Sequence, residues 1–386
     1  MLVHELVSQG QKNAPAIVDH QRRFTYEDFQ TAVNNCRNKL YASGVRRGDR
    51  VGFFSRNSAD YLFAYMGAVS LGAIAVPINF QLSNREIAYI IKDAGIQVLL
   101  TYQPLNLVDA LASLRCDLKV TQYDIKTLSK ADKKITAAPP LADDFSDTEP
   151  CMILYTSGTT GNPKGVLHEY GNLSRAIESI RIDGTDPFTD KERVALLAPM
   201  NFVASVILIL KLFSIERAKL FVVSYATIKN PLALKTYFLE KRISVTFLTP
   251  SYVRMLGNTT GPFLRMLVVG SEPANNLYNP NVELINVYAA SESGFAVGVF
   301  TIDKAYETCP IGKPEIETKI TLIGEDGNKV EDGEIGLAQH HLLGVGGHLV
   351  NDAHGRDLAA GTGGGGHDIG GGLHYEAGVA VFLHED

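Results

Sequence analysis

The sequence lacks the features of a secreted, metal-stapled or membrane-spanning protein. Its four cysteines, Cys36, Cys116, Cys151 and Cys309, form no CxxC pair and no cluster, which argues against a zinc finger and a disulfide scaffold. The first fifteen residues lack the basic start and apolar core of a signal peptide. No run of 18 apolar residues predicts a membrane span. We therefore expect a soluble, cytoplasmic protein whose cysteines are packing residues.

An excess of positive charge is also missing. The chain has 36 basic and 42 acidic residues, a net charge of −6, so no strong positive field would hold a nucleic-acid backbone or an anionic membrane. Hydrophobic residues make up 45% and charged residues 20%, which is ordinary for a globular protein. A chain of 386 residues exceeds what one hydrophobic core usually serves, so we expect two or three subdomains.

Helices and strands are predicted to alternate through the first third of the chain. Thr25 with Asp28 resembles a capping box that opens a helix over 24–44, and Ser83 with Glu86 opens another over 84–95. A third helix is predicted over 58–72, and apolar strands over 46–55, 73–79 and 96–102. This β-α-β-α order predicts a doubly wound α/β domain.

The rest of the chain is predicted to contain a connection, more strands and a small β subdomain. Residues 130–150 carry many charges, a Pro-Pro pair and little periodicity, so we expect a surface connection. Strands are expected over 194–200, 218–224, 245–250, 265–270 and 283–288. From residue 316 onward, alternating residues and turn signals predict a β subdomain over 316–386 that includes a glycine-rich tail. The histidines of this tail have no zinc-site spacing, and we expect no metal site there.

The most informative segment is YTSGTTGNPKGV, residues 155–166. It follows a buried apolar strand and contains only small or hydroxylated residues, glycines and one lysine. The hydroxyls are Thr156, Ser157, Thr159 and Thr160, the glycines are Gly158, Gly161 and Gly165, and the cation is Lys164. Such a loop offers a polyphosphate many donors and close approach to the backbone. Its spacing differs from that of a Walker A loop. A polar connection between a strand and a helix is the alternative.

This segment resembles the signature of the adenylate-forming (ANL) superfamily, which comprises acyl- and aryl-CoA synthetases, adenylation domains of nonribosomal peptide synthetases and firefly-type luciferases. NVYAASE, residues 286–292, resembles the family's N-x-Y-G-x-T-E motif, with Ala289 for glycine and Ser291 for threonine. VGSEP (269–273), IGKP (311–314) and EDGEIG (331–336) match further segments in order.

The resemblance runs from about residue 10 to 336. It implies two doubly wound α/β subdomains plus a small distorted β-barrel subdomain. Residues 1–386 would form the large AMP-binding N-terminal core, without the family's small C-terminal lid domain.

The resemblance also implies a reaction and the residues that perform it. A carboxylate attacks the α-phosphate of ATP, pyrophosphate leaves, and a thiol, usually that of CoA, attacks the acyl-adenylate. Catalytic roles would fall to Thr156, Lys164, Ser291 and Glu292. The outer phosphates would be held by Thr156, Ser157, Gly158, Thr159, Thr160, Gly161 and Lys164. The adenine and acyl pockets would be lined by Gly270, Ser271, Glu272 and Pro273. Tyr288, beside Ala289 and Ala290, would stack on adenine, while Ser291 would bind the α-phosphate, Glu292 would bind Mg²⁺ and Asp368 would bind the ribose. The alternative for Asp368 is a loop carboxylate.

The acid pocket is predicted to be apolar. In amino-acid-activating members, an aspartate in an F-D-A-S segment pairs with the substrate ammonium. The segment here is Phe202-Val203-Ala204-Ser205, preceded by Asn201, and Val203 cannot hold an ammonium ion. We expect an ATP-dependent ligase for a fatty or related acid, with an aryl acid second and CoA as co-substrate. A nucleotide-binding inactive remnant, or an adenylation domain that loads a carrier protein, are the alternatives.

Overall fold

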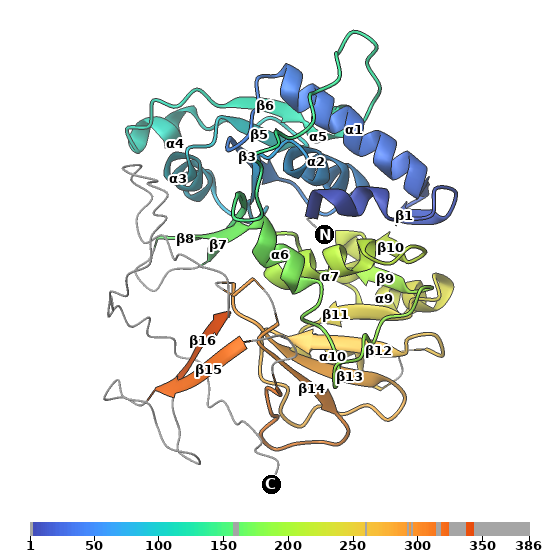
Figure 1. Cartoon of the computed structure of the whole chain (residues 1–386). Helices are drawn as coiled ribbons and strands as arrows, with labels where there is room; N and C mark the ends of the chain where they lie inside the picture. Colours follow the sequence, from blue (N-terminus) through green and yellow to red (C-terminus); the bar gives the residue numbers. More distant parts are fainter. Residues whose placement is uncertain are drawn as a thin grey trace.

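The structure, a computed structural model, describes residues 3–156, 162–258, 261–291, 293–294, 296–313, 318–323 and 337–342. It is a mixed α/β protein built on two large sheets of mainly parallel strands. The two sheets form an upper and a lower lobe in Figure 1. The α/β class predicted from the sequence is therefore confirmed.

The upper lobe contains a six-stranded sheet of order β6-β5-β3-β4-β7-β8. Its strands are β3 (Arg50–Phe54), β4 (Ile74–Pro77), β5 (Val98–Thr101), β6 (Thr121–Asp124), β7 (Pro150–Thr156) and β8 (Lys164–Glu169). All pairs are parallel except β7 with β8, which is antiparallel. Because β4 and β5 lie on opposite sides of β3, the chain winds outward in both directions, as predicted.

Helices cover both faces of this sheet. They are α1 (Tyr26–Ala42), α2 (Ala59–Val69), α3 (Asn84–Ala94), α4 (Val108–Ser113) and α5 (Ile125–Leu128), preceded by the 3₁₀ helix η1 (Val3–Ser8). Residues of α1 and α2 share a core with Val51 and Phe53, whereas residues of α3 pack in a separate cluster with Phe54. Since neighbouring residues of a strand point to opposite faces, the two clusters lie on opposite faces of β3.

The lower lobe contains an eight-stranded sheet of order β14-β13-β12-β11-β9-β10-β1-β2. Its strands are β1 (Pro15–Asp19), β2 (Arg22–Thr25), β9 (Arg193–Leu196), β10 (Lys219–Val222), β11 (Val245–Leu248), β12 (Met266–Gly270), β13 (Glu283–Tyr288) and β14 (Gly298–Ile302). The six inner strands are parallel, and β2 and β14 are antiparallel edges. Its helices are α6 (Tyr170–Ala176), α7 (Val203–Phe213), α8 (Tyr225–Ile228), α9 (Pro231–Glu240) and α10 (Pro250–Leu256).

The predicted helix starts are confirmed by their cap geometry. The Thr25 side chain accepts a hydrogen bond from the Asp28 amide while the Asp28 carboxylate accepts from the Thr25 amide. Ser83 and Glu86 form the same reciprocal box at the start of α3. Gly95 ends α3 in the left-handed conformation, φ 67°, which glycine adopts without steric cost. Local side-chain chemistry therefore sets these boundaries.

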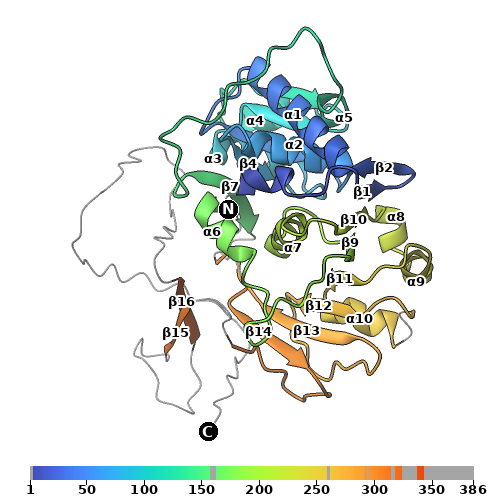
Figure 2. The ribbon, with the colours of Figure 1, turned by 45° about the vertical axis from the view of Figure 1, so that its right-hand side comes forward.

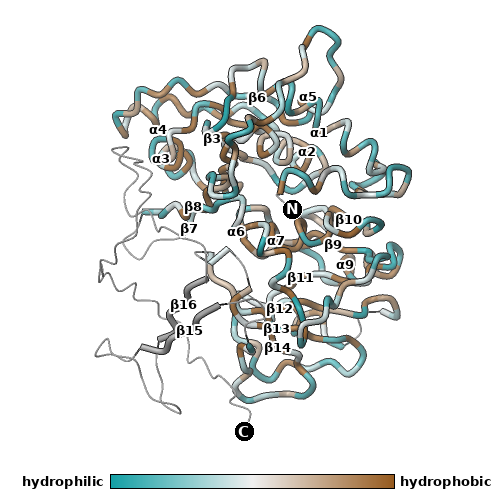
Figure 3. Tube along the Cα trace, viewed as in Figure 1, coloured by the Kyte–Doolittle hydropathy of each residue, from teal (hydrophilic) through white to brown (hydrophobic). Residues whose placement is uncertain are grey.

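One continuous core joins the two lobes. It combines buried residues of α1, α2 and α7 with residues of both sheets, and α7 contacts β9, β10 and β11 as well as η1 and α6. Figure 2 shows α7 between the upper lobe and the lower sheet. The inner strands of the lower sheet carry hydrophobic residues in Figure 3, and hydrophilic residues lie mostly on the outer loops. The only charged residue buried within α7, Lys211, pairs with Asp186.

The N-terminal hairpin β1–β2 was not predicted. It adds to the lower sheet beside β10, although the helix that follows it belongs to the upper lobe. The buried Asp19 carboxylate accepts from the Ala59 amide at 2.9 Å, and Arg22 pairs with Asp19 and with Asp60 of α2. These charges connect the hairpin to the upper lobe.

Two segments lie outside the large sheets. Residues 129–149 contain no helix or strand, and Arg37 and Arg47 bind this segment through Ala138 and Glu149. Beyond residue 316, β15 (Thr318–Ile323) and β16 (Leu337–Leu342) form an antiparallel pair. The rest of the expected β subdomain lies outside the described residues, and no closed barrel is seen in the described part.

Glu192→Gln should destabilise the lower lobe. The buried Glu192 carboxylate accepts from the Thr189 amide and hydroxyl, both at 2.9 Å, from Ser244 Oγ at 2.5 Å, and from Arg265. The amide loses the charge and part of the accepting capacity, so we expect a loss of about 1–3 kcal/mol in the free energy of unfolding. Urea denaturation measures this.

Glu283→Gln is the matched control for Glu192→Gln. Glu283 lies 4.0 Å from the same Arg265 but is exposed, so its substitution should change the free energy of unfolding by less than about 1 kcal/mol. Equal effects of the two substitutions would contradict the importance of the buried carboxylate.

Candidate functional site

The segment predicted to bind phosphate, residues 155–166, connects the two strands of a β-hairpin. β7 ends at Thr156, β8 begins at Lys164, and the two residues face each other across the ladder. The sequence alternative of a connection into a helix is therefore wrong, because a strand follows the loop. Ser157, Gly158, Thr159, Thr160 and Gly161 lie outside the described residues. The hairpin brings a hydroxyl and an ammonium group together at the mouth of the loop.

The two faces of this hairpin have different partners. Side chains alternate along a strand, so Thr156 and Lys164 share one face, and Tyr155 points to the other. The Tyr155 hydroxyl donates to Asp93 of α3 at 2.5 Å; its burial, together with Asp93, raises the pKa of this phenol. A Cβ on Gly165 would lie 3.2 Å from the Tyr155 ring. Gly165 therefore has a packing role on the second face.

The second group of predicted residues lies at the end of β13 and in the turn that follows it. Asn286 is buried and donates through Nδ2 to the carbonyl oxygen of Pro310 at 2.8 Å, so it holds a neighbouring loop. Tyr288 ends the strand and packs against the shared core. Ala289, Ala290 and Ser291 follow, half-buried. The Ser293 and Gly294 amides both donate to the Ala290 carbonyl, which closes a turn. Glu292 lies outside the described residues.

The hairpin and this turn pack directly against each other. His168 of β8 and Asn172 of α6 face the turn: Asn172 Nδ2 donates to the Ser293 carbonyl at 3.0 Å, and a Cβ on Gly294 would lie 2.6 Å from His168 Nδ1. Gly294 has a positive φ of 69°. Sequence reasoning missed all three residues. Of the three, only His168 could have been found from the sequence, because it lies four residues after Lys164 and therefore on the same strand face.

The segment after β12 is also at the carboxyl end of the lower sheet. Gly270 ends the strand so close to β13 that a Cβ would lie 2.5 Å from the Val287 carbonyl oxygen. Ser271, Glu272 and Pro273 follow, exposed. Glu272 accepts from the Ser251 amide at 3.0 Å and from its hydroxyl at 2.9 Å. This carboxylate therefore has a structural partner at the start of α10.

The predicted acid-pocket residues surround the start of α7. Asn201 is half-buried, Phe202 is 46% exposed, and Val203 is buried as the first residue of the helix. Asn57, from the upper lobe, donates to the Ala198 carbonyl at 2.8 Å and accepts from the Met200 amide at 3.2 Å. These hydrogen bonds hold the loop before α7 against the upper lobe.

His168 has an unusual electrostatic environment. Its side chain is fully buried, and neither ring nitrogen makes a hydrogen bond among the described residues. Burial lowers its pKa to about 4, and the main chain of Ser291 opposes this shift without reaching normal hydrogen-bond geometry. The ring is therefore neutral at physiological pH.

Metal and membrane features are limited within the described ranges. No three His, Cys, Asp or Glu side chains come together there as metal ligands; the predicted magnesium ligand Glu292 and the predicted ribose ligand Asp368 both lie outside those ranges. None of the helices in the described part has the length and apolar character that crossing a bilayer requires.

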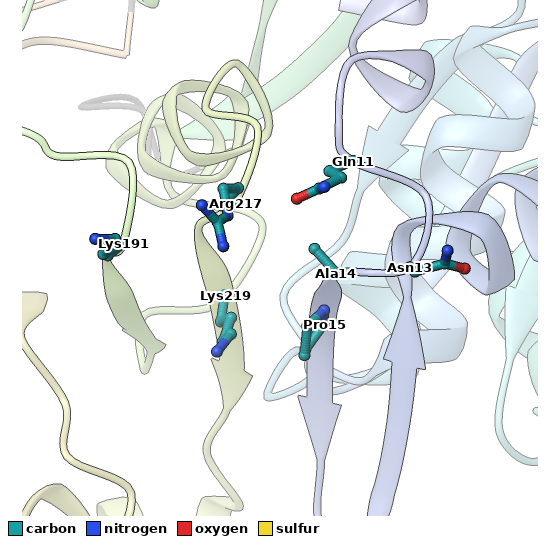
Figure 4. A pocket seen from close by; sticks show the side chains of 7 residues that line it. All are labelled: Gln11, Asn13, Ala14, Pro15, Lys191, Arg217 and Lys219. Carbon is teal, nitrogen blue, oxygen red and sulfur yellow. The ribbon is translucent and has the colours of Figure 1, made fainter.

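A recess of about 450 Å³ lies elsewhere, at the amino ends of β1, β9 and β10. Figure 4 shows Lys191, Arg217 and Lys219 around it. Burial lowers the pKa of Lys219, and the neighbouring charges of Arg193 and Arg217 lower it further. None of the predicted site residues that the structure describes lines this recess: Thr156 and Lys164 belong to the upper sheet, and residues 270–273 and 288–291 follow the opposite, carboxyl ends of β12 and β13.

Acid should weaken the fold through His168. In the unfolded chain this side chain takes up a proton near pH 6.5, whereas in the folded protein it does so only near pH 4. Proton uptake by His168 in the unfolded chain therefore has no effect above pH 6.5, and it lowers the free energy of unfolding as the pH falls toward 4, by up to about 3 kcal/mol. Urea titrations between pH 7 and pH 4.5 measure this loss.

His168→Leu should flatten that acid dependence, since the leucine cannot be protonated. Parallel stability curves for the wild type and the His168 variant would contradict the assignment.

The chain is similar to known proteins in sequence and in fold. A family model described as AMP-binding enzyme matches residues 5–338. The long-chain-fatty-acid–CoA ligase FadD13 of Mycobacterium tuberculosis is 29% identical over 329 residues, 81% of this chain and 64% of that protein. Tyrocidine synthase 1 of Brevibacillus parabrevis is 26% identical over 84% of this chain and 30% of that protein. The chain thus spans less than two thirds of either relative.

A solved structure has the same fold. The inhibitor-bound N-terminal domain of FACL13 from Mycobacterium tuberculosis superposes with a TM-score of 0.73 at 23% identity, covering 88% of each chain. This likeness concerns the fold of the two lobes. Since the family model covers most of the sequence, the chain belongs to the AMP-binding enzymes of the adenylate-forming (ANL) superfamily.

Proposed function

We propose that this chain is the nucleotide- and acid-binding core of an ATP-dependent acid–thiol ligase, which activates a fatty or related apolar carboxylic acid as acyl-AMP. The observation that carries the proposal is the packing of the β7–β8 hairpin against the turn after β13, at His168 and Gly294. Two segments that each suit a phosphate group are brought to one place.

The phosphate-binding part rests on the hairpin tip. Thr156 and Lys164 face each other at the mouth of a loop rich in hydroxyls and glycines, where a hydroxyl and an ammonium can bind anionic oxygens. We propose that the loop from Thr156 to Lys164 holds the β- and γ-phosphates and that Ser291 binds the α-phosphate. Tyr288 would stack on adenine, with Ala289, Ala290 and residues 270–273 around it. Glu292 would ligate Mg²⁺ and Asp368 the ribose; both lie outside the described residues.

The apolar substrate is supported by the start of α7. Val203 is buried and uncharged, and an ammonium ion beside it would have no partner there. An unpaired buried charge costs several kcal/mol. The fatty-acid specificity stated in the name of FadD13 agrees with this choice. We propose a fatty acid first and an aryl acid second.

The thiol acceptor is proposed to be CoA. A carrier-protein thiol is the alternative that a peptide synthetase relative favours, since tyrocidine synthase 1 also matches most of this chain. A nucleotide-binding remnant without turnover is the third possibility. Acid-dependent ATP–pyrophosphate exchange, followed by thioester assays with CoA, separates the three.

Substrate class can be tested by binding. Stable acyl-adenylate analogues that carry a fatty chain should bind at least ~100-fold more tightly than analogues with a free α-amino group, because Val203 offers the ammonium no counter-charge. Isothermal titration calorimetry measures both affinities on the same protein. Tighter binding of the aminoacyl analogue would overturn the proposed substrate class, and failure to bind either would overturn the function.

Lys164→Ala should weaken ATP binding by about 10- to 100-fold. Loss of a hydrogen bond from a charged group costs about 1.5–3 kcal/mol. An acyl-adenylate analogue lacks the outer phosphates, so its affinity should stay within about threefold of wild type. Calorimetry with both ligands separates the two effects.

Lys191→Ala is the matched control for Lys164→Ala. Lys191 is an exposed lysine at the opposite edge of the lower sheet, and its loss should change neither affinity. Equal loss of ATP and analogue binding in Lys164→Ala would contradict the assignment to the outer phosphates.

A further inference from the structure

His168 is a buried polar group without an evident structural purpose. Its side chain is fully buried, and both ring nitrogens lack a hydrogen bond among the described residues. Buried polar atoms are nearly always paired, because leaving one unpaired costs free energy. A leucine at this position would fill a similar space without that cost. The histidine therefore needs a second explanation.

The position of His168 connects it with the phosphate hairpin, that is, the β7–β8 hairpin that carries Thr156 and Lys164. In β8, Lys164, Val166 and His168 alternate onto one face, and their partners in β7 are Thr156, Leu154 and Met152. Lys164 lies at the open end of this face, and His168 lies about 13 Å further along the strand. The buried ring thus belongs to the same rigid ladder that carries the proposed phosphate ligands.

On its other side the ring touches the turn that carries Ser291. Gly294 approaches so closely that an added Cβ would lie 2.6 Å from Nδ1 and 2.9 Å from Cε1 of His168. Asn172 anchors the same turn by donating to the Ser293 carbonyl at 3.0 Å. The main-chain polar group that acts on the ring is that of Ser291. A small movement of the turn would complete a hydrogen bond between them.

We propose that His168 is a positioning residue, which sets the distance between the phosphate hairpin and the Ala290–Gly294 turn and donates a hydrogen bond to the Ser291 carbonyl when ligand engages Ser291. This inference rests on the proposed function, because it needs Ser291 at the α-phosphate. A ligand that fixes Ser291 in place would give the buried ring a hydrogen bond that it lacks among the described residues.

A role in packing alone makes a different prediction. If the ring only fills space, an apolar side chain serves as well, and both stability and ligand affinity are unchanged. If the ring positions Ser291, His168→Leu keeps the fold but weakens those ligands that reach Ser291. Adenosine has no phosphate, so the affinity for adenosine should not change.

The experiment compares adenosine with a stable acyl-adenylate analogue on the full 386-residue chain. We expect His168→Leu to unfold at the same temperature as wild type or higher at pH 7. Its affinity for the analogue should fall roughly tenfold or more, as loss of one hydrogen bond to a strongly bound ligand allows. Its affinity for adenosine should stay within about threefold. Thermal denaturation and calorimetry provide the three readouts.

Two further variants make the test specific. His168→Gln can still donate to the Ser291 carbonyl and should retain most of the analogue affinity. His4→Leu is the matched control: His4 also has a buried, unpaired ring nitrogen, but it packs against Phe145 and Tyr170. It should bind both ligands as wild type does.

The outcomes separate this inference from the function on which it rests. Wild-type protein that binds neither ligand would refute the proposed function and the role of His168 with it. Wild-type binding with an unaffected His168→Leu, or with equal loss of adenosine and analogue, would overturn the inference alone. If His168→Leu fails to fold, His168→Gln decides: retained analogue affinity supports the role, and a folded variant with weak analogue binding overturns it.

Discussion

The site depends on one close contact, in which the turn after β13 lies directly on the β7–β8 hairpin. Gly294 makes this approach possible because it has no side chain and adopts a positive φ. Without that contact, the loop between Thr156 and Lys164 and the turn at Ser291 would be separate features of two lobes. With it, a rigid strand ladder and a short turn share one surface. Phosphate chemistry needs such fixed donors, since donors that must reorganise lose much of their electrostatic advantage.

The two lobes can hold this geometry because they share a core and a buried charge cluster. α7 lies between them, and Asn57 fastens the loop before α7 to the upper lobe. The N-terminal hairpin completes the lower sheet, and Arg22 ties it to Asp60 of α2. Buried carboxylates are tolerated here because each has a cationic or amide donor. The lobes therefore behave as one scaffold around the site.

Polar groups are distributed unevenly along the hairpin face that carries the site. Thr156 and Lys164 lie at its open end, where a ligand can reach them, and His168 lies at its closed end, fully buried and neutral. Real proteins break local packing rules mainly at functional sites. The unpaired imidazole is such a departure, and its place beside Ser291 is why it bears on ligand binding and not only on stability.

The sequence alone determined the local features and the family. Each capping box, at Thr25 and at Ser83, joins residues only three positions apart, and each apolar strand is a run of about five residues. Both features are local, so both could be predicted. The motif at 155–166 predicted phosphate binding because its residue types suffice for that chemistry. Only the tertiary structure showed that β8 follows the loop, that β1 joins a sheet built from residues 193–302, and that His168 meets Gly294. The second and third of these depend on contacts between residues more than 100 positions apart, whose pairing no local pattern encodes.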